Sequence, residues 1–275
     1  MLKQRILTAV AIGLPALALI AWGPNWGVLA LVAVVVGLAS WEWAGLTGLE
    51  GVPARVILVA LVVAPVVALG LTLAQPVHLL VLLFAVVWWL AIVLALPFYR
   101  GPEEGRGPRR PLLVAAAVLT LVPAGMGLVW LHALNPWMVV YLILLVAVAD
   151  TGAYFAGRAF GRTKLAPEIS PGKTREGLLG GLVAVLALAI VAAVLQELVP
   201  MDALVFVLLS ILIGLVSVVG DLFESILKRQ AGAKDSGSLL PGHGGILDRI
   251  DSLVAAAPVF LAGLLWLALL PVPGQ

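Results

Sequence analysis

The chain has 275 residues, of which 63% are hydrophobic and only 11% carry a charge. Soluble domains average about 25% charged residues, so this chain could not cover a water-facing surface. Because there is no cysteine, disulfides, thiolate nucleophiles and cysteine metal sites are excluded. A net charge of +2 gives no indication that nucleic acid is a partner. The composition therefore predicts an integral membrane protein.

Apolar runs long enough to cross a membrane, which takes about 20 residues, follow one another along the whole chain. They are expected near 6–22, 27–46, 54–73, 77–97, 111–132, 136–157, 177–198, 202–227 and 252–271. The predicted fold class is an all-α polytopic membrane protein with about nine transmembrane helices. The tryptophans fall mostly towards the ends of these runs, as in an interfacial aromatic belt. Lys3 and Arg5 could begin a signal peptide, but the apolar run continues and further spans follow, so we expect a retained first helix.

The basic residues separate the loops into two sets. All 16 Lys and Arg fall on alternate loops, starting with the N-terminus, and the opposite loops carry none. By the positive-inside rule, the N-terminus is cytoplasmic and the C-terminus lies outside. The early spans hold almost no ionisable residues, so we expect residues 1–110 to form a scaffold. Residues 111–275 are expected to be the catalytic region, with cytoplasmic loops at 157–176 and 228–251.

Carboxylates inside a membrane are expensive and are functional candidates by default. Asp150 lies near the cytoplasmic end of the sixth run and shares a helical face with Tyr154 and Arg158. A structural contact with either of these residues explains Asp150 equally well. Its role is therefore open at this point.

Two acidic residues, Asp221 and Glu224, lie near the end of the eighth run. Asp221, Ser225 and Lys228 form one stripe on the predicted helix. Glu224 and Lys228 are four residues apart and could form an ordinary salt bridge, which favours a structural role for Glu224. Asp221 has no lysine or arginine one turn away, so it is the stronger functional candidate.

The segment 228–251 combines basic residues, glycines and aspartates. Its basic residues are Lys228, Arg229, Lys234 and Arg249. Such side chains neutralise phosphates, and the glycines around His243 allow backbone N–H groups to approach an anion. Asp248 and Asp251 share one face of the ninth helix and suit Mg²⁺ together with phosphate oxygens and water. The alternative is a solvated loop with capping aspartates.

The residues from Ser225 to Asp251 closely resemble the signature of the phosphatidate cytidylyltransferase (CDP-diacylglycerol synthase) family. Within this segment stand Lys228-Arg229, Lys234-Asp235 and Pro241-Gly-His243-Gly-Gly-Ile-Leu-Asp248-Arg249-Ile-Asp251. A second region, from Asp150-Thr-Gly-Ala-Tyr154 to Ser170-Pro-Gly-Lys173-Thr174-Arg175-Glu176-Gly177, is also similar to that family. The resemblance covers roughly residues 140–260.

The resemblance implies an enzyme of phospholipid synthesis that transfers CMP from CTP to phosphatidic acid, forming CDP-diacylglycerol and pyrophosphate. It implies a multi-pass protein of the inner (cytoplasmic) membrane whose active site faces the cytoplasm. The expected cofactor is Mg²⁺. A second cation could also bind, since two-metal sites suit in-line displacement. We also expect a homodimer.

The roles that follow from the resemblance fall into two groups. Asp221 and Asp248 are expected to be the main Mg²⁺ ligands, with Asp251 third. The residues expected to hold or orient phosphates are Lys173, Arg175, Ser225, Lys228, Arg229, Lys234, His243 and Arg249. Arg175 stands where family members often carry an aromatic residue, so its role is open. We expect a lipid phosphate oxygen to attack the α-phosphorus of CTP directly.

Two other functions are compatible with parts of the sequence. A transporter of an anionic substrate could use Asp150 and Asp221 as coupling sites, but such proteins often show internal repeats and broken helices near the midplane. A related CTP-dependent enzyme could act on another lipid phosphate or on a polyprenol.

Overall fold

A computed structural model describes residues 2–49, 51–72, 76–101, 110–239 and 244–270, with backbone alone for 2–10 and 12. The first half contains α1 (Leu2–Trp22), α2 (Asn25–Leu46), α3 (Val52–Leu71), α4 (Pro76–Ala95), the short 3-10 helix η1 (Leu96–Phe98) and α5 (Arg110–Leu134). The second half contains α6 (Pro136–Phe160), β1 (Lys164–Ala166), β2 (Ser170–Thr174), α7 (Arg175–Leu195), α8 (Pro200–Gln230) and α9 (Leu247–Trp266).

Each predicted apolar run corresponds to one α-helix, with ends that differ by a few residues. Among the described residues, eight of these helices are long and apolar enough to cross a membrane, and the described apolar part of α1 is shorter, at Gly13–Trp22. The chain is thus a polytopic helical membrane protein. The predicted loop 157–176 differs from a plain connector, because it holds the antiparallel hairpin β1–β2.

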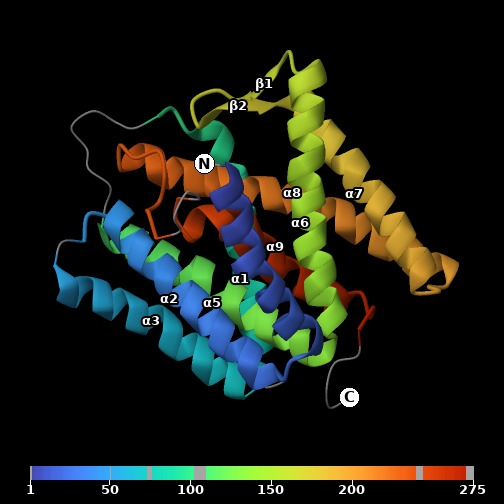
Figure 1. Cartoon of the computed structure of the whole chain (residues 1–275), viewed down its shortest axis with the longest axis horizontal. Helices are drawn as coiled ribbons and strands as arrows, with labels where there is room; N and C mark the ends of the chain where they lie inside the picture. The colour runs from blue at the N-terminus through green and yellow to red at the C-terminus, as the bar shows by residue number, and fades with distance from the viewer. Residues whose placement is uncertain (1, 50, 73–75, 102–109, 240–243, 271–275) are drawn as a thin grey trace.

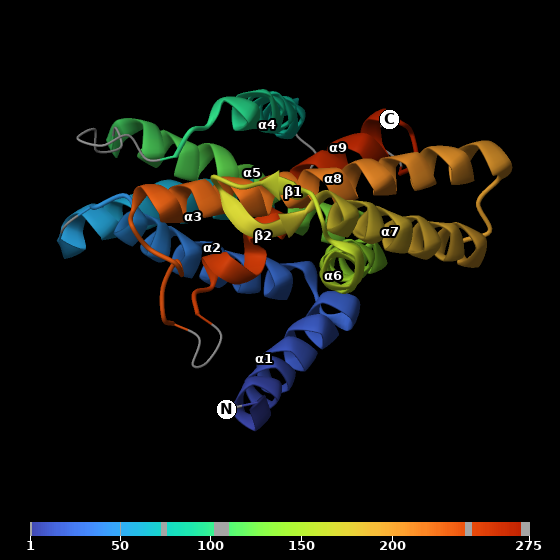
Figure 2. The same cartoon turned by 90° about the horizontal axis from the view of Figure 1, so that it is seen from above.

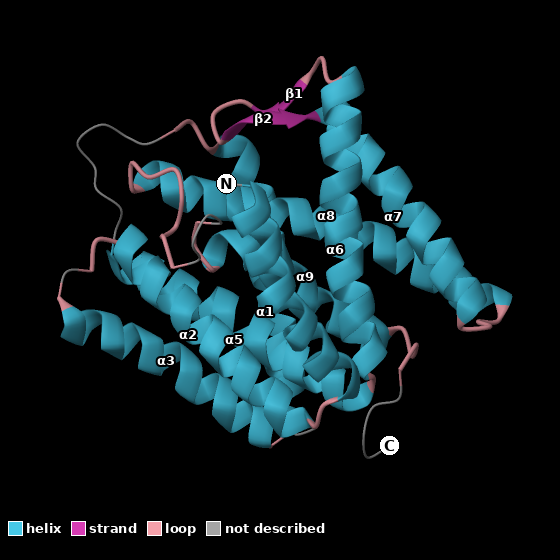
Figure 3. Ribbon diagram, viewed as in Figure 1, coloured by secondary structure: helices cyan, strands magenta, loops and turns pink. Residues whose placement is uncertain are grey.

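Helix α9 lies in the middle of the bundle, as Figure 1 shows, and contacts α2, α4, α5, α6 and α8. Helix α1 extends away from the other helices in Figure 2. The hairpin lies beyond the C-terminal end of α6, on the same side of the bundle as the C-terminal end of α8 (Figure 3). The elements that carry polar residues therefore meet at one end of the bundle.

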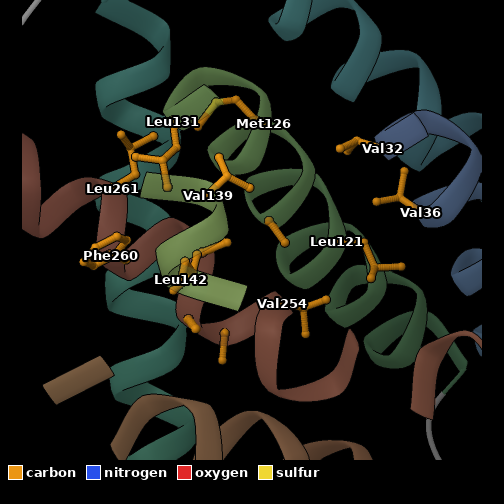
Figure 4. Close-up of a cluster of buried hydrophobic side chains, with 14 of the residues drawn as sticks. Val32, Val36, Leu121, Met126, Leu131, Val139, Leu142, Val254, Phe260 and Leu261 are labelled. Carbon is orange, nitrogen blue, oxygen red and sulfur yellow. The ribbon is translucent and has the colours of Figure 1, made fainter. Parts of the chain in front are cut away.

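The core of the bundle forms around α9. Phe260 and Leu261 are fully buried and lie near Leu131 and Leu142 of α5 and α6 (Figure 4). Lipid is as apolar as these side chains, so close van der Waals packing rather than hydrophobic burial holds such helices together. The packing fixes α9, and with it the carboxylates on its first turns.

Small residues bring α6 and α7 into close contact. A Cβ atom on Gly181 would lie 2.7 Å from the carbonyl oxygen of Ala149, and one on Gly152 would lie 2.8 Å from Cβ of Ala184. Only glycine allows this backbone approach without a shift of one helix. Asp150, next to Ala149, is therefore held at a fixed distance from α7 and from the hairpin that precedes α7.

The tryptophans only partly follow the predicted aromatic belt. Four are exposed at helix ends that meet on one side of the bundle: Trp22, Trp26, Trp137 and Trp266. Three others are buried, and for them the prediction is wrong: Trp43, Trp89 and Trp130. The reason is packing between helices, since Trp43 donates to the carbonyl of Leu113 at 3.0 Å and Trp89 packs edge-to-face against Phe223.

Candidate active site

Three carboxylates and a lysine from four different elements meet where α6, α8 and α9 approach the hairpin. The ammonium of Lys173, on β2, lies 2.5 Å from Oδ2 of Asp221 on α8. The carboxylates of Asp150 on α6 and Asp251 on α9 both lie close enough to Asp221 to repel it electrostatically. Lys173 also interacts with Asp150 and Asp251, so one ammonium interacts with three carboxyl groups.

Gly220 explains why α8 and α9 bring their carboxylates together. A Cβ atom at this position would collide with the carbonyl oxygen of Asp251 and would lie 2.9 Å from Cβ of Ala255. The missing side chain therefore lets the two backbones touch one residue before Asp221. Any larger residue would push Asp221 and Asp251 apart.

A second charged cluster lies along the C-terminal end of α8. The ammonium of Lys228 lies 2.5 Å from Oε2 of Glu224 and 2.8 Å from Oδ1 of Asp248. The predicted salt bridge between Glu224 and Lys228 is confirmed, and it is buried, since Glu224 is 3% exposed. Lys228 therefore links α8 to the first turn of α9.

The carboxylate of Asp248 is surrounded by donors from its own loop. The backbone N–H of Ser236 donates to both oxygens, at 3.2 and 3.0 Å, and the N–H of Gly245 donates to Oδ2 at 2.9 Å. Gly244, with φ of +83°, makes the turn that aims this N–H. With Lys228 added, the acceptor positions of Asp248 are used within the protein.

Glu42, on α2, is a site residue that the sequence analysis missed. It is 4% exposed and accepts hydrogen bonds from the hydroxyl of Ser236 at 3.1 Å and from the backbone N–H groups of Ile246 at 3.1 Å and Leu247 at 2.8 Å. The signal was present, because a carboxylate inside an apolar run is a functional candidate. The predicted scaffold region thus supplies a direct contact to the 228–251 loop.

Two cavities open beside the clusters and share a wall. A polar pocket of about 450 Å³ is lined by Asp150, Lys173 and Asp221, among other residues of α6, α7 and α8. An apolar groove of about 770 Å³ runs between α4, α8 and the hairpin. Leu165 and Leu178 line both cavities. A polar and an apolar compartment therefore lie side by side.

The other predicted residues lie around these cavities with differing contacts. The hydroxyl of Ser225 donates to Oδ1 of Asp221 at 3.3 Å, and Nε of Arg229 donates to the carbonyl of Ile169 at 3.4 Å. Arg175, Lys234 and Arg249 are exposed. His243 lies outside the described residues.

The residues that share a face with Asp150 contact each other rather than Asp150. Nη1 of Arg158 donates to the hydroxyl of Tyr154 at 3.3 Å, and both residues line the polar pocket. Asp150 instead faces Lys173 and Asp221. Asp150 therefore belongs to the same group of charged residues as Lys173 and Asp221.

The chemistry of the carboxylates suits a hard cation. Asp221 and Asp251 repel each other, and a cation between them would relieve this repulsion. Asp221 has Lys173 and Ser225 as partners and Oδ1 of Asp251 accepts from the N–H of Ser252 at 2.6 Å, whereas Asp248 has more contacts, with Lys228, Ser236 and Gly245. Within the described ranges, no three acidic or histidine side chains already surround one metal position. Mg²⁺ is commonly held by one or two carboxylates and completes its shell with phosphate oxygens and water, so Asp221 and Asp251 could hold it.

Comparison with known proteins gives a family and full-length relatives. The model of the cytidylyltransferase family matches residues 3–267. A phosphatidate cytidylyltransferase of Pseudomonas aeruginosa is 45% identical over 278 residues, which cover 98% of each chain. One of Haemophilus influenzae is 38% identical over 288 residues, covering 94% of this chain and 97% of the relative. One of Bacillus subtilis is 45% identical over 118 residues, covering 43% of this chain and 44% of the relative.

Proposed function

The chain belongs to the cytidylyltransferase family, and from this premise we propose that it transfers CMP from CTP to phosphatidic acid. The products are CDP-diacylglycerol and pyrophosphate. The observation that carries the proposal is the polar pocket that shares a wall with the apolar groove. One substrate is a soluble triphosphate and the other is a lipid whose phosphate must meet it, so the reaction needs both compartments in contact.

The apolar groove has the size and position for the lipid tails. Small-molecule sites typically measure 300–1,000 Å³, and this groove, at about 770 Å³, is lined mainly by aliphatic residues of α4 and α8. Its lining also includes Trp89 and Tyr99, whose indole Nε1 and hydroxyl have no hydrogen-bond partner among the described residues.

The mouth of the groove carries charge of both signs. Burial raises the pKa of Tyr99 against the opposing effect of the nearby Arg229, so the phenol remains a hydrogen-bond donor at neutral pH. Arg100 and Glu168 line the same end. A lipid phosphate that leaves the groove here meets Arg229 and, beyond Leu165, the polar pocket.

The nucleotide belongs in the polar pocket and along the 228–251 loop. Lys173 is the basic residue of this site, and Ser225 orients the carboxylate of Asp221. The exposed Lys234 lies in the loop before α9, and the exposed Arg175 and Arg249 lie in the first turns of α7 and α9; these three residues would surround a triphosphate. We keep Lys228 in the site as the residue that fixes Asp248, because its ammonium is already held by two carboxylates.

Mg²⁺ is the proposed cofactor, with Asp221 and Asp251 as its protein ligands. When bound, it would neutralise charge on the phosphate oxygens. The sequence placed Asp248 ahead of Asp251, but the hydrogen bonds of Asp248 favour the reverse order. Asp248 then acts mainly by holding Lys228 and the loop. Asp150 adds a third carboxylate, on which a second cation could bind.

The reaction needs no covalent enzyme intermediate. An oxygen of the lipid phosphate attacks the α-phosphorus of CTP, a new P–O bond forms, and the bond to the β-phosphate breaks as pyrophosphate leaves. Lys173 and the arginines around the site stabilise the charge that spreads over the phosphate oxygens. Positioning of two bound substrates supplies much of the remaining acceleration.

The orientation in the membrane is part of the proposal. The positive-inside rule applied to the 16 basic residues supports a cytoplasmic N-terminus, nine spans and an external C-terminus, with the site facing the cytoplasm. In a bacterial cell this is the inner membrane. A homodimer stays a prediction from the sequence.

Purified protein in detergent provides the test. With Mg²⁺, CTP and phosphatidic acid, pyrophosphate should be released and CDP-diacylglycerol should form, and a chelator should stop both. A panel of lipid phosphates and polyprenyl phosphates separates this activity from that of related CTP-dependent enzymes. Release with a polyprenyl phosphate but not with phosphatidic acid would change the substrate. No release with any lipid, together with uptake of an anion into vesicles, would replace the enzyme with a transporter.

A further inference from the structure

Glu42 is a buried carboxylate that touches the 228–251 loop from the opposite half of the chain. It stands between Trp41 and Trp43 on α2, and its three donors lie 194, 204 and 205 residues further along. These donors are neutral, namely one hydroxyl and two backbone amides. A buried carboxylate is costly without good compensation, and a neutral side chain would pack α2 at lower cost. The cost of burial indicates that the role of the carboxylate is to hold its three donors.

The loop is built around this carboxylate. A Cβ atom on Gly237 would lie 2.5 Å from Oε1 of Glu42, and one on Gly245 would lie 2.5 Å from Oε2. Both glycines therefore let the backbone wrap closely around Glu42. Its bonds to Ile246 and Leu247 also satisfy amides at the start of α9, which intrahelical bonds cannot reach.

A short relay connects Glu42 to the charged cluster. The hydroxyl of Ser236 donates to Oε2 of Glu42 and accepts from the backbone N–H of Asp248 at 3.3 Å. The N–H of Ser236 donates in turn to the carboxylate of Asp248, which holds Lys228 at 2.8 Å. One carboxylate on α2 thus determines where Ser236 lies, and Ser236 determines the position of Asp248.

We infer that Glu42 is a positioning residue for the 228–251 loop. It anchors Ser236 and the first turn of α9, and so sets the geometry of Asp248 and Lys228. The catalytic part of this inference rests on the proposed function. The anchoring part does not, because it predicts an ordered loop in the absence of substrate. Two kinds of readout therefore separate the inference from the activity.

The experiment compares E42Q and E42A with a matched control, S40A. Ser40 is buried on the same helix, but its hydroxyl bonds within the helix, to the carbonyl of Val36 at 2.6 Å. Amide hydrogen exchange of the segments 234–239 and 244–248 is measured for each purified protein. We expect exchange at least tenfold faster in E42A, an intermediate effect in E42Q, which keeps some acceptor capacity, and native exchange in S40A.

Kinetics of pyrophosphate release give the second readout. E42Q should lower kcat at least tenfold and leave the KM for phosphatidic acid within about twofold, because the lipid groove lies on other elements. The double variant E42A/S236A should be no slower than E42A, since both substitutions cut the same relay. S40A should keep native kcat.

Three results would overturn the inference: unchanged exchange in E42A, native kcat in E42Q, or rate losses that multiply in the double variant. Unfolding temperatures in detergent show whether a loss of rate follows from a loss of fold, and E42Q serves if E42A does not fold. If the native protein releases no pyrophosphate with any lipid, the proposed function fails. The exchange data then decide the anchoring role alone.

Discussion

Replacing Lys228 with methionine tests the buried charge network most directly. The exposed fractions of Lys228, Glu224 and Asp248 are 15%, 3% and 8%, so the two carboxylates have little water to replace the lost ammonium. Removing one partner of a buried ion pair costs about 3–5 kcal/mol, because an uncompensated charge remains. For a chain of this size that corresponds to a fall of roughly 6–20 °C in Tm. Methionine keeps an unbranched chain of similar length, so packing changes little.

The measurement is thermal unfolding in detergent, with pyrophosphate release alongside. K164M is the matched control, since Lys164 is exposed on β1. Adding E224Q to K228M should recover about half of the lost stability, because the buried carboxyl group that has lost its partner is removed while Asp248 keeps its donors from Ser236 and Gly245. Activity should stay at least about 10²-fold down in both variants. A K228M protein as stable as the native one, or a double variant less stable than K228M, would refute this account of the cluster.

Other predictions concern the cation, the groove and the reaction path. D221N and D251N should each abolish turnover in a folded protein, whereas D202N, the same change at the opposite end of α8, should be nearly silent. Turnover assays with Mg²⁺ titration check this, and normal turnover in D251N would remove Asp251 from the set of proposed ligands. Leu215→Trp fills part of the apolar groove and should raise the KM for phosphatidic acid several-fold but not that for CTP, whereas Leu208→Trp, on the same helix but outside the groove lining, should not. With CTP made chiral by sulfur at the α-phosphorus, direct attack should invert configuration, and net retention would indicate a covalent intermediate.

The sequence was sufficient to predict the helices and the segments whose charged residues meet at the candidate site. Helices in lipid must satisfy their own backbone hydrogen bonds, so long apolar runs leave little freedom of interpretation. The carboxylates stood out for the same reason, because charge is rare in such runs. The i, i+4 spacing of Glu224 and Lys228 predicted a contact that is confirmed. These predictions depend on short-range geometry, which the sequence contains.

The contacts that assemble the site depend on distant segments and were not predictable in the same way. Asp221 lacked a basic residue one turn away, yet Lys173 reaches it from a hairpin that the sequence pattern did not indicate. Glu42 lies in the region 1–110, for which the sequence predicts only a scaffold, and its hydrogen-bond donors lie 194 to 205 residues further along the chain. The order of Asp248 and Asp251 as ligands depended on hydrogen bonds to Asp248, and turn geometry sets those bonds.

The hairpin β1–β2 is one of the elements that line both compartments, together with α7 and α8. Leu165 on β1 lines both cavities, and Ile169 in the turn lines the apolar groove. Lys173 on β2 pairs with Asp221 in the polar pocket, while Arg229 at the end of α8 donates to the carbonyl of Ile169. A movement of the hairpin would therefore shift the basic residue of the pocket and the wall of the groove together. In the proposed reaction, the position of the lipid in the apolar groove would therefore affect the position of Lys173 relative to the lipid phosphate.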